Sequence, residues 1–308
     1  MTPRPVTTIA IAVLAATALL PVASATAADP DDMCFGKPFT IDARGSGQTP
    51  TVGTEGPDVI VGGTIVHGLG GNDRICSLRG ADVVYGGPGD DMIDGGSQED
   101  FIEGGPGDDF LRAGLDTCYC DQGYGPGGEV LSVRDATGPT TVDLMHGVAS
   151  GPGIGHDTLS VSPGTGWWYA GVEFSEVHGS PYADVIVGGK AWNGNALFGF
   201  GGDDRIRGGD QRDLPAGEYT YDLLVGGRGN DRLRARAGAD LLEGNRGKDV
   251  LNGGDGGDDR DVVRYAAPAT VNWNTCRISG DEGTDRMVEI EAGPRKSDGA
   301  TVIGSPPC

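Results

Sequence analysis

Aspartates recur every nine residues over two long stretches of this 308-residue chain. The spacing holds at Asp73, Asp82, Asp91, Asp100 and Asp109, and again at Asp204, Asp213, Asp222, Asp231, Asp240, Asp249 and Asp258. Around each aspartate the sequence approaches G-G-x-G-x-D-x-U-x, where U is a bulky aliphatic residue, as in segments 86–94 and 104–112. A repeat this regular predicts a stack of identical loops that each present one carboxylate.

The loop chemistry favours a hard cation. Glycines at the first, second and fourth positions let the backbone adopt φ > 0 and aim carbonyl oxygens into the turn. Backbone and carboxylate oxygens in a flexible loop fit Ca²⁺ better than Mg²⁺, provided that six or more of them converge. One loop cannot supply that many ligands, so we expect calcium to lie between two stacked loops.

The spacing also predicts which loops stack. If each nine-residue unit crosses the structure once, the partner of each loop lies 18 residues away on the same edge. This rule pairs Asp73 with Asp91 and Asp91 with Asp109, and places Asp82 and Asp100 on the opposite edge. We expect weak binding or none on that second edge, because its loops lack glycines. In the second stretch the rule groups Asp213, Asp231 and Asp249 on one edge, and Asp204, Asp222, Asp240 and Asp258 on the other.

The fold is predicted to be all-β, because glycine recurs every few residues and no apolar pattern of helical period persists beyond the N-terminal region. Each repeat contributes one inward aliphatic side chain to a thin core. These residues are Ile75, Val84, Ile93, Ile102 and Leu111 in the first stretch, and Ile206, Leu224, Leu233, Leu242 and Leu251 in the second. The rolls are expected to be loose without calcium and to fold as calcium binds, because a ligand that binds only the folded form stabilises it.

Five regions are expected along the chain. Residues 1–27 have an apolar run and end in the small-residue site Ala25-Thr-Ala27, as in a cleavable secretory signal peptide. A first roll with an N-terminal cap follows at 28–122, then a bridge of short strands at 123–178, a second roll at 179–263 and a C-terminal β cap at 264–308. The cap echoes the bridge, which indicates an internal duplication.

Charge and cysteine content bear on location and partners. The formal charge of −22 becomes −23 when Arg4 leaves with the signal peptide, which makes nucleic acid a poor partner. No segment after the signal approaches the roughly 20 apolar residues of a membrane span, so we expect a secreted, extracellular protein. Six cysteines in an exported chain favour disulfides, and Cys34–Cys76 and Cys276–Cys308 are the pairings that would tie chain ends to regular segments. Cys118 and Cys120 replace the next expected aspartate and aliphatic.

The repeats resemble the hemolysin-type calcium-binding repeats of the repeats-in-toxin (RTX) superfamily, over about 53–121 and 179–263. The resemblance implies two right-handed parallel β-rolls, or β-solenoids, with Ca²⁺ as the cofactor between turns. It implies ligation by the sixth-position aspartates and by carbonyls of the preceding loop. The implied ligands are Gly68, Gly70, Asp73, Gly86, Pro88, Asp91, Gly104, Pro106, Asp109, Asp204, Asp213, Gly226, Arg228, Asp231, Asp240, Gly244 and Asp249. Unlike the superfamily's toxins and proteases, this chain is expected to contain no comparable large effector domain.

The leading functional interpretation is a non-enzymatic, calcium-stabilised extracellular scaffold. A polysaccharide-modifying enzyme is the main alternative, with Glu173 and Glu176 as a carboxylate pair on the bridge. The sequence contains no H-E-x-x-H, G-x-S-x-G or phosphate-loop motif. A third interpretation is a module that binds an extracellular glycan or cell-surface ligand through segment 167–169 (Trp-Trp-Tyr), although aromatic residues more often fill a core.

Overall fold

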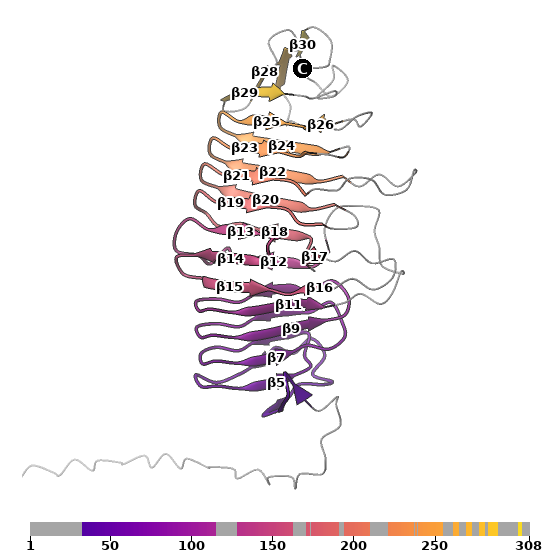
Figure 1. Cartoon of the computed structure of the whole chain (residues 1–308), viewed down its shortest axis with the longest axis vertical. Helices are drawn as coiled ribbons and strands as arrows, with labels where there is room; N and C mark the ends of the chain where they lie inside the picture. Colours follow the sequence, from indigo (N-terminus) through magenta and orange to yellow (C-terminus); the bar gives the residue numbers. More distant parts are fainter. Residues whose placement is uncertain are drawn as a thin grey trace, which may run out of the picture.

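The computed structural model describes residues 33–114, 128–162, 171–172, 174–190, 194–209, 221–236, 238, 240–254, 261–264, 269–272, 277–280, 283–288 and 301–303. All regular elements within these residues are β-strands, as predicted. They stack one above another along the long axis of the molecule (Figure 1). No helix in the described part of the chain is long and apolar enough to cross a membrane.

Two sheets form the body of the stack. The first is parallel throughout and is called here the ten-strand sheet. In spatial order it contains β4 (Thr51–Val52), β6 (Ile65–His67), β8 (Val83–Tyr85), β10 (Phe101–Glu103), β12 (Val130–Ser132), β18 (Glu176–His178), β20 (Ala196–Gly201), β22 (Leu223–Arg228), β24 (Leu241–Arg246) and β26 (Val262–Val263).

The second is called the sixteen-strand sheet, and it is parallel except for two hairpin insertions. In spatial order it contains β3 (Ile41–Asp42), β5 (Val59–Val61), β7 (Arg74–Cys76), β9 (Met92–Gly96), β11 (Phe110–Gly114), β15 (Gly155–Leu159), β14 (Val148–Gly151), β13 (Thr141–Asp143), β19 (Val185–Val187), β21 (Arg205–Arg207), β23 (Arg232–Arg234), β25 (Val250–Asn252), β29 (Gly283–Val288), β28 (Arg277–Gly280), β27 (Ala269–Asn272) and β30 (Thr301–Ile303).

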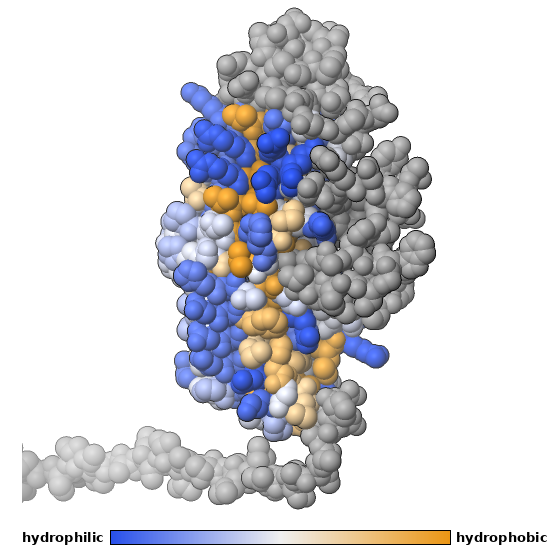
Figure 2. Space-filling model, in the orientation of Figure 1, coloured by the Kyte–Doolittle hydropathy of each residue, from blue (hydrophilic) through white to orange (hydrophobic). Residues whose placement is uncertain are grey.

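The core lies between the two sheets. Successive residues of a strand face opposite sides, so one residue in each short strand points inward. All ten inward aliphatics predicted from the repeat are at most 1% exposed, which confirms the sequence register. In the view of Figure 2, hydrophilic residues line the left of the stack, where short turns lie, and an apolar band runs beside them.

The predicted bridge prolongs both sheets. Its strands β12 and β18 continue the ten-strand sheet from the first roll into the second, so the two rolls form one continuous stack. In the other sheet, the antiparallel strands β15, β14 and β13 lie between β11 and β19. The same order recurs at the C-terminal end, where β29, β28 and β27 lie between β25 and β30. This repeated topology is what an internal duplication of roll and bridge produces.

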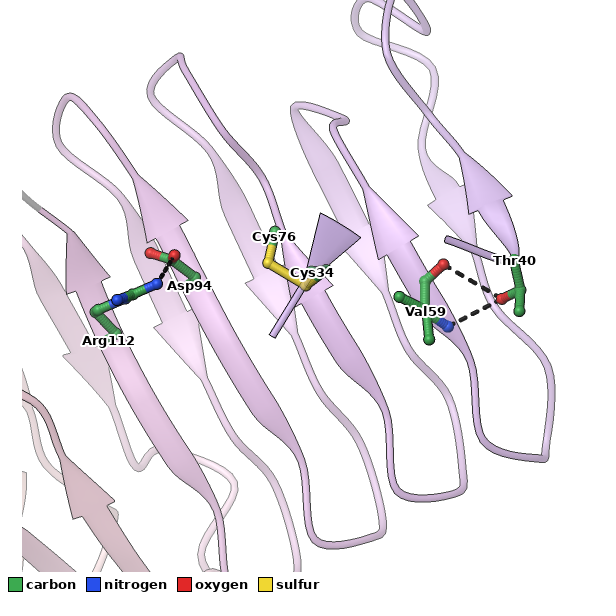
Figure 3. The surroundings of a disulfide bond; sticks show 6 residues. All are labelled: Cys34, Thr40, Val59, Cys76, Asp94 and Arg112. Carbon is green, nitrogen blue, oxygen red and sulfur yellow. Dashed lines mark hydrogen bonds and ion pairs between the residues drawn. A yellow bond between two sulfur atoms is a disulfide. The ribbon is translucent and has the colours of Figure 1, made fainter. Parts of the chain in front are cut away.

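Two small antiparallel sheets complete the structure. One joins β16 (Val161–Ser162) to β17 (Gly171–Val172), and the other joins β1 (Met33–Cys34) to β2 (Lys37–Pro38). The predicted disulfide between Cys34 and Cys76 is present, and it ties β1 to β7 of the first roll (Figure 3). The other four cysteines lie outside the described residues.

Candidate metal site

The chain passes between the sheets along two different edges. Turns from the ten-strand sheet to the sixteen-strand sheet are short and define the short-turn edge, on the left in Figure 1. Connections in the opposite direction define the long-loop edge, because the long connections after β11, β15, β19, β21 and β25 all lie there. Insertions therefore accumulate on one edge and leave the other regular.

A ladder of aspartates runs along the short-turn edge. The backbone N–H of each aspartate donates to Oδ1 of the aspartate one turn further along, from Asp73 to Asp91 (2.8 Å) and from Asp91 to Asp109 (2.8 Å). These are the pairs that the 18-residue rule predicts. The ladder begins at Asp58 and reaches Asp157 on β15, which accepts from Asp109 at 3.2 Å.

The second roll repeats the ladder with a different spacing. Asp184 donates to Asp204, Asp204 to Asp231, and Asp231 to Asp249, at 2.8–2.9 Å. The grouping of Asp204 with Asp222 is therefore wrong. Asp204 and Asp231 are 27 residues apart instead of 18, because an extra nine-residue unit lies between them. Asp204 therefore shares an edge with Asp231 and not with Asp222.

The long-loop edge carries a shorter ladder. Asp82 donates to Asp100 and Asp100 to Glu129 Oε2 in the first half. In the second half, Asn195 donates to Asp222, Asp222 to Asp240, and Asp240 to Asp261. Asp261 takes the place predicted for Asp258, because 21 residues instead of 18 separate it from Asp240. Asp213 and Asp258 themselves lie outside the described residues.

The second carboxylate oxygen of the ladder aspartates is the chemically informative atom. Oδ1 is occupied by an N–H, whereas Oδ2 is buried and has no hydrogen-bond partner among the described residues in Asp73, Asp82, Asp91, Asp109, Asp204 and Asp231. A buried carboxylate oxygen without a donor carries a large desolvation cost. A cation that accepts this oxygen as a ligand removes that cost.

Burial raises the pKa values of the ladder carboxyl groups. Desolvation raises the pKa of Asp91 and Asp204 to about 8 and that of Asp109 and Asp231 to about 7, with neighbouring aspartate charges adding to the effect. The pKa of Asp73 rises to about 6 for the same first reason. The fold therefore holds a row of carboxyl groups whose charge is uncompensated by protein.

The first glycine of each loop forms a cradle for Oδ2. A Cβ on Gly86 would collide with Asp91 Oδ2 and would approach the Gly104 carbonyl oxygen of the next loop. A Cβ on Gly68 would collide in the same way with the Gly86 carbonyl, so a carboxylate oxygen and a carbonyl of the next loop converge over the same glycine. Oxygen-only donors from two loops are the ligand set that calcium prefers. The residues present thus fit the metal that the sequence predicts.

The carbonyls at the third loop position serve the stacking of the loops. Pro88 O accepts from Gly71 N–H and Pro106 O from Gly89 N–H, each at 2.9 Å, and Arg246 O accepts from Gly229 N–H at 2.9 Å. A carbonyl oxygen has two lone pairs, so these bonds leave one acceptor site on each. No group of three or more His, Cys, Asp or Glu side chains converges within the described residues.

Two loops differ because their second residue carries a hydroxyl group. Asp58 Oδ2 accepts from Thr54 N–H (2.7 Å) and Oγ1 (2.9 Å), and Asp184 Oδ2 accepts from Ser180 N–H (2.6 Å) and Oγ (2.9 Å). Thr140 adds two more bonds to Asp184 Oδ1. Protein donors thus replace a cation at the loop that opens each roll.

The nine-residue period does not predict several acids of the ladders, including Glu129, Asp157 and Asp261. Each lies two residues before a buried aliphatic, as in Glu129-Val-Leu131 and Asp157-Thr-Leu159. The ladder is therefore marked by a three-residue pattern, in which an acid is followed by any residue and then by a buried aliphatic. This pattern persists where the glycine-rich loop and the nine-residue spacing are lost.

Comparison with known proteins agrees with this geometry. The family model for the RTX calcium-binding nonapeptide repeat matches four times, at residues 65–84, 85–117, 195–215 and 225–259. The chain carries RTX calcium-binding repeats. The four matches cover just over a third of the sequence and fall on the two rolls, each of which contains stacked RTX loops.

No curated protein matches the chain. Among solved structures the chain is similar to the extracellular lipase LipA from Serratia marcescens, with 19% sequence identity and a TM-score of 0.26. The match covers 78% of this chain and 38% of the lipase, so the chain spans well under half the length of that enzyme.

Proposed function

We propose that this protein is secreted and that calcium ions, held between stacked RTX loops and coupled to folding, turn it into a rigid extracellular scaffold. The short-turn edge supplies the principal sites, with the ligands Gly68, Gly70, Asp73, Gly86, Pro88, Asp91, Gly104, Pro106, Asp109, Asp204, Gly226, Arg228, Asp231, Gly244 and Asp249. Asp240 lies on the long-loop edge and belongs to a weaker set.

The buried and unpartnered Oδ2 atoms carry this proposal. In the loops that begin at Gly68, Gly86 and Gly199, the unpartnered Oδ2 of the aspartate and a carbonyl oxygen of the next loop lie over the same glycine. A cation with high coordination number satisfies both loops at once, and because the loops meet only in the folded stack, binding stabilises that stack.

A calcium titration of the mature, oxidised protein after chelation tests the proposal. Far-ultraviolet circular dichroism should show a gain of β-structure while calorimetry counts several bound ions per chain. Magnesium, added as the control, should produce little change because it demands a small octahedral site. A protein whose β-signal and heat do not respond to calcium would contradict the proposal.

A scaffold implies a surface that meets a partner, and an extracellular glycan or another cell-surface ligand is the partner class that we propose. Segment 167–169, the aromatic candidate for glycan binding, and Glu173, a candidate catalytic carboxylate, both lie outside the described residues. Glu176 is described, and its carboxylate lies 2.6 Å from His178 Nε2.

A further inference from the structure

Four arginines form a square on the outer face of the second roll. Arg205 and Arg207 on β21 lie opposite Arg232 and Arg234 on β23, in the register of two neighbouring parallel strands. The residues between them, Ile206 and Leu233, are buried, so alternation directs all four arginines outward, and all four are exposed. This set is called the arginine square.

The square is an arrangement that a sheet does not favour by itself. Like charges directly opposite one another on adjacent strands destabilise the pairing. The first roll avoids this conflict on the same sheet, because Arg112 faces Asp94 one turn away and forms an ion pair with it (Figure 3). Arg112 also lies over the ring of Phe35 at 5.5 Å. Within the described residues, none of the four arginines of the square forms an ion pair.

Few exposed acids surround the square within the part of the second roll that the structure describes. Between 199 and 264 the described residues include eight arginines and one lysine. Eight acids occur there as well, but six of them are buried members of the ladders. Of the two outside the ladders, Glu243 is paired with Arg264 at 3.0 Å. Hydrogen bonds from Asn230 and, to a smaller extent, the charge of Arg232 lower the pKa of Asp203, so one exposed acid lies near the square. Among the described residues, the outer face of β21 and β23 is therefore cationic, on a chain whose net charge is −22.

The geometry of the square sets the shape of its ligand. The backbones of opposite arginines are about 4.8 Å apart across the strands, and those of alternate arginines are about 6.6 Å apart along a strand. A guanidinium group binds carboxylate or sulfate through two parallel hydrogen bonds, and several such contacts made by one polymer reinforce each other. Val185 and Val187 flank the square on β19, so the cationic area is narrow.

We propose that the arginine square binds a linear anionic polysaccharide. A thin polymer contacts the square alone, whereas a membrane or a nucleic acid duplex would also meet the acidic surface of the rest of the chain and be repelled. The inference rests on the proposed function, because calcium must compensate the buried ladder carboxylates for this face to be cationic. It adds to that function the surface and the chemical class of the ligand.

Calorimetry on the calcium-loaded, full-length mature protein tests the inference. The probes are a short polygalacturonate, which carries carboxylates, and a dextran sulfate of similar length. We expect wild-type protein to bind at least one of them with an affinity that falls as salt rises. The variant R207Q/R234Q should lose roughly tenfold in affinity, and the variant with all four arginines changed to glutamine should not bind.

The matched control is K37Q/R79Q, which removes two exposed cations from the N-terminal cap and first roll and should bind as the wild type does. Equal loss in this control, or no binding of either polymer to the wild type, overturns the inference. So does dimerisation in sedimentation that salt and R207Q/R234Q both abolish, because the square would then bind the acidic surface of a second copy. The calcium titration of the same variants separates the two proposals: a normal calcium response without polymer binding rejects only the polysaccharide.

Discussion

At the scale of the residue, we expect the partner of Oδ2 to distinguish metal-binding aspartates from structural ones. Asp91→Asn should reduce the number of bound calcium ions, because it removes the charge of an oxygen that no protein donor reaches. Asp184→Asn should leave the number of ions unchanged and destabilise the fold by about 1–3 kcal/mol with or without calcium, because Ser180 and Thr140 already donate to that carboxylate. Calorimetric ion counts and urea unfolding in chelator measure both effects. Equal ion loss in the two variants would contradict this assignment.

Backbone conformation gives a second prediction for single residues. Gly87 has φ of +103°, and a Cβ there would collide with the Leu69 carbonyl oxygen of the preceding loop. Gly87→Ala should therefore destabilise the calcium-loaded protein by more than the roughly 1–2 kcal/mol that a left-handed conformation alone costs. Leu69 occupies the same loop position with φ of +74° and an exposed side chain, so Leu69→Gly should stabilise by about 1 kcal/mol. Urea unfolding at fixed free calcium is the measurement, and opposite signs are the expected result.

At the scale of the element, the short strands obey the sequence pattern and the connections do not. The inward aliphatics and the 18-residue pairing of Asp73 with Asp91 follow from alternation and from a constant turn length, both of which the sequence displays. The 27-residue turn before Asp231 does not follow, because an extra nonapeptide leaves the period intact while it changes the edge. The hairpin β13–β15 also lacks the repeat, and only Asp157 before Leu159 marks where it rejoins the ladder.

The N-terminal element offers a test of how the first turn is held. Replacement of both Cys34 and Cys76 by serine should lower the free energy of unfolding by about 2–4 kcal/mol, because the disulfide closes a separation of 42 residues. The loop of Asp73 lies within the segment that the disulfide closes, but its hydrogen bonds to the next loop do not depend on the disulfide, so the calcium count should stay the same. Thermal unfolding in calcium and a parallel titration measure the two quantities. A fall in the number of ions would show instead that the clamp and the loops fold as one unit.

At the scale of the whole molecule, the proposed calcium sites make protons and calcium competitors for the same row of carboxylates. The folded pKa values of about 6 to 8 lie above the value near 4 of an unfolded aspartate, so in chelator the folded state binds more protons over this window. The stability of the calcium-free protein should therefore fall as pH rises from about 4 to about 8. In saturating calcium the sign should reverse, because deprotonation frees the ligands that bind the metal.

Thermal unfolding midpoints at pH 5, 6.5 and 8 (about one and a half pH units apart), in chelator and in millimolar calcium, test this reversal. The two series should slope in opposite directions and lie closest together at the acid end, where protonated carboxyl groups bind calcium poorly. A variant with asparagine at Asp91, Asp109, Asp204 and Asp231 should reduce both slopes, since four of the carboxyl groups with raised pKa values are gone, while Asp73, Asp82 and Asp157 still titrate. Parallel slopes in the wild type would mean that calcium does not bind at the buried ladder. The exposed acids, whose charge salt screens, would then be the groups that bind it.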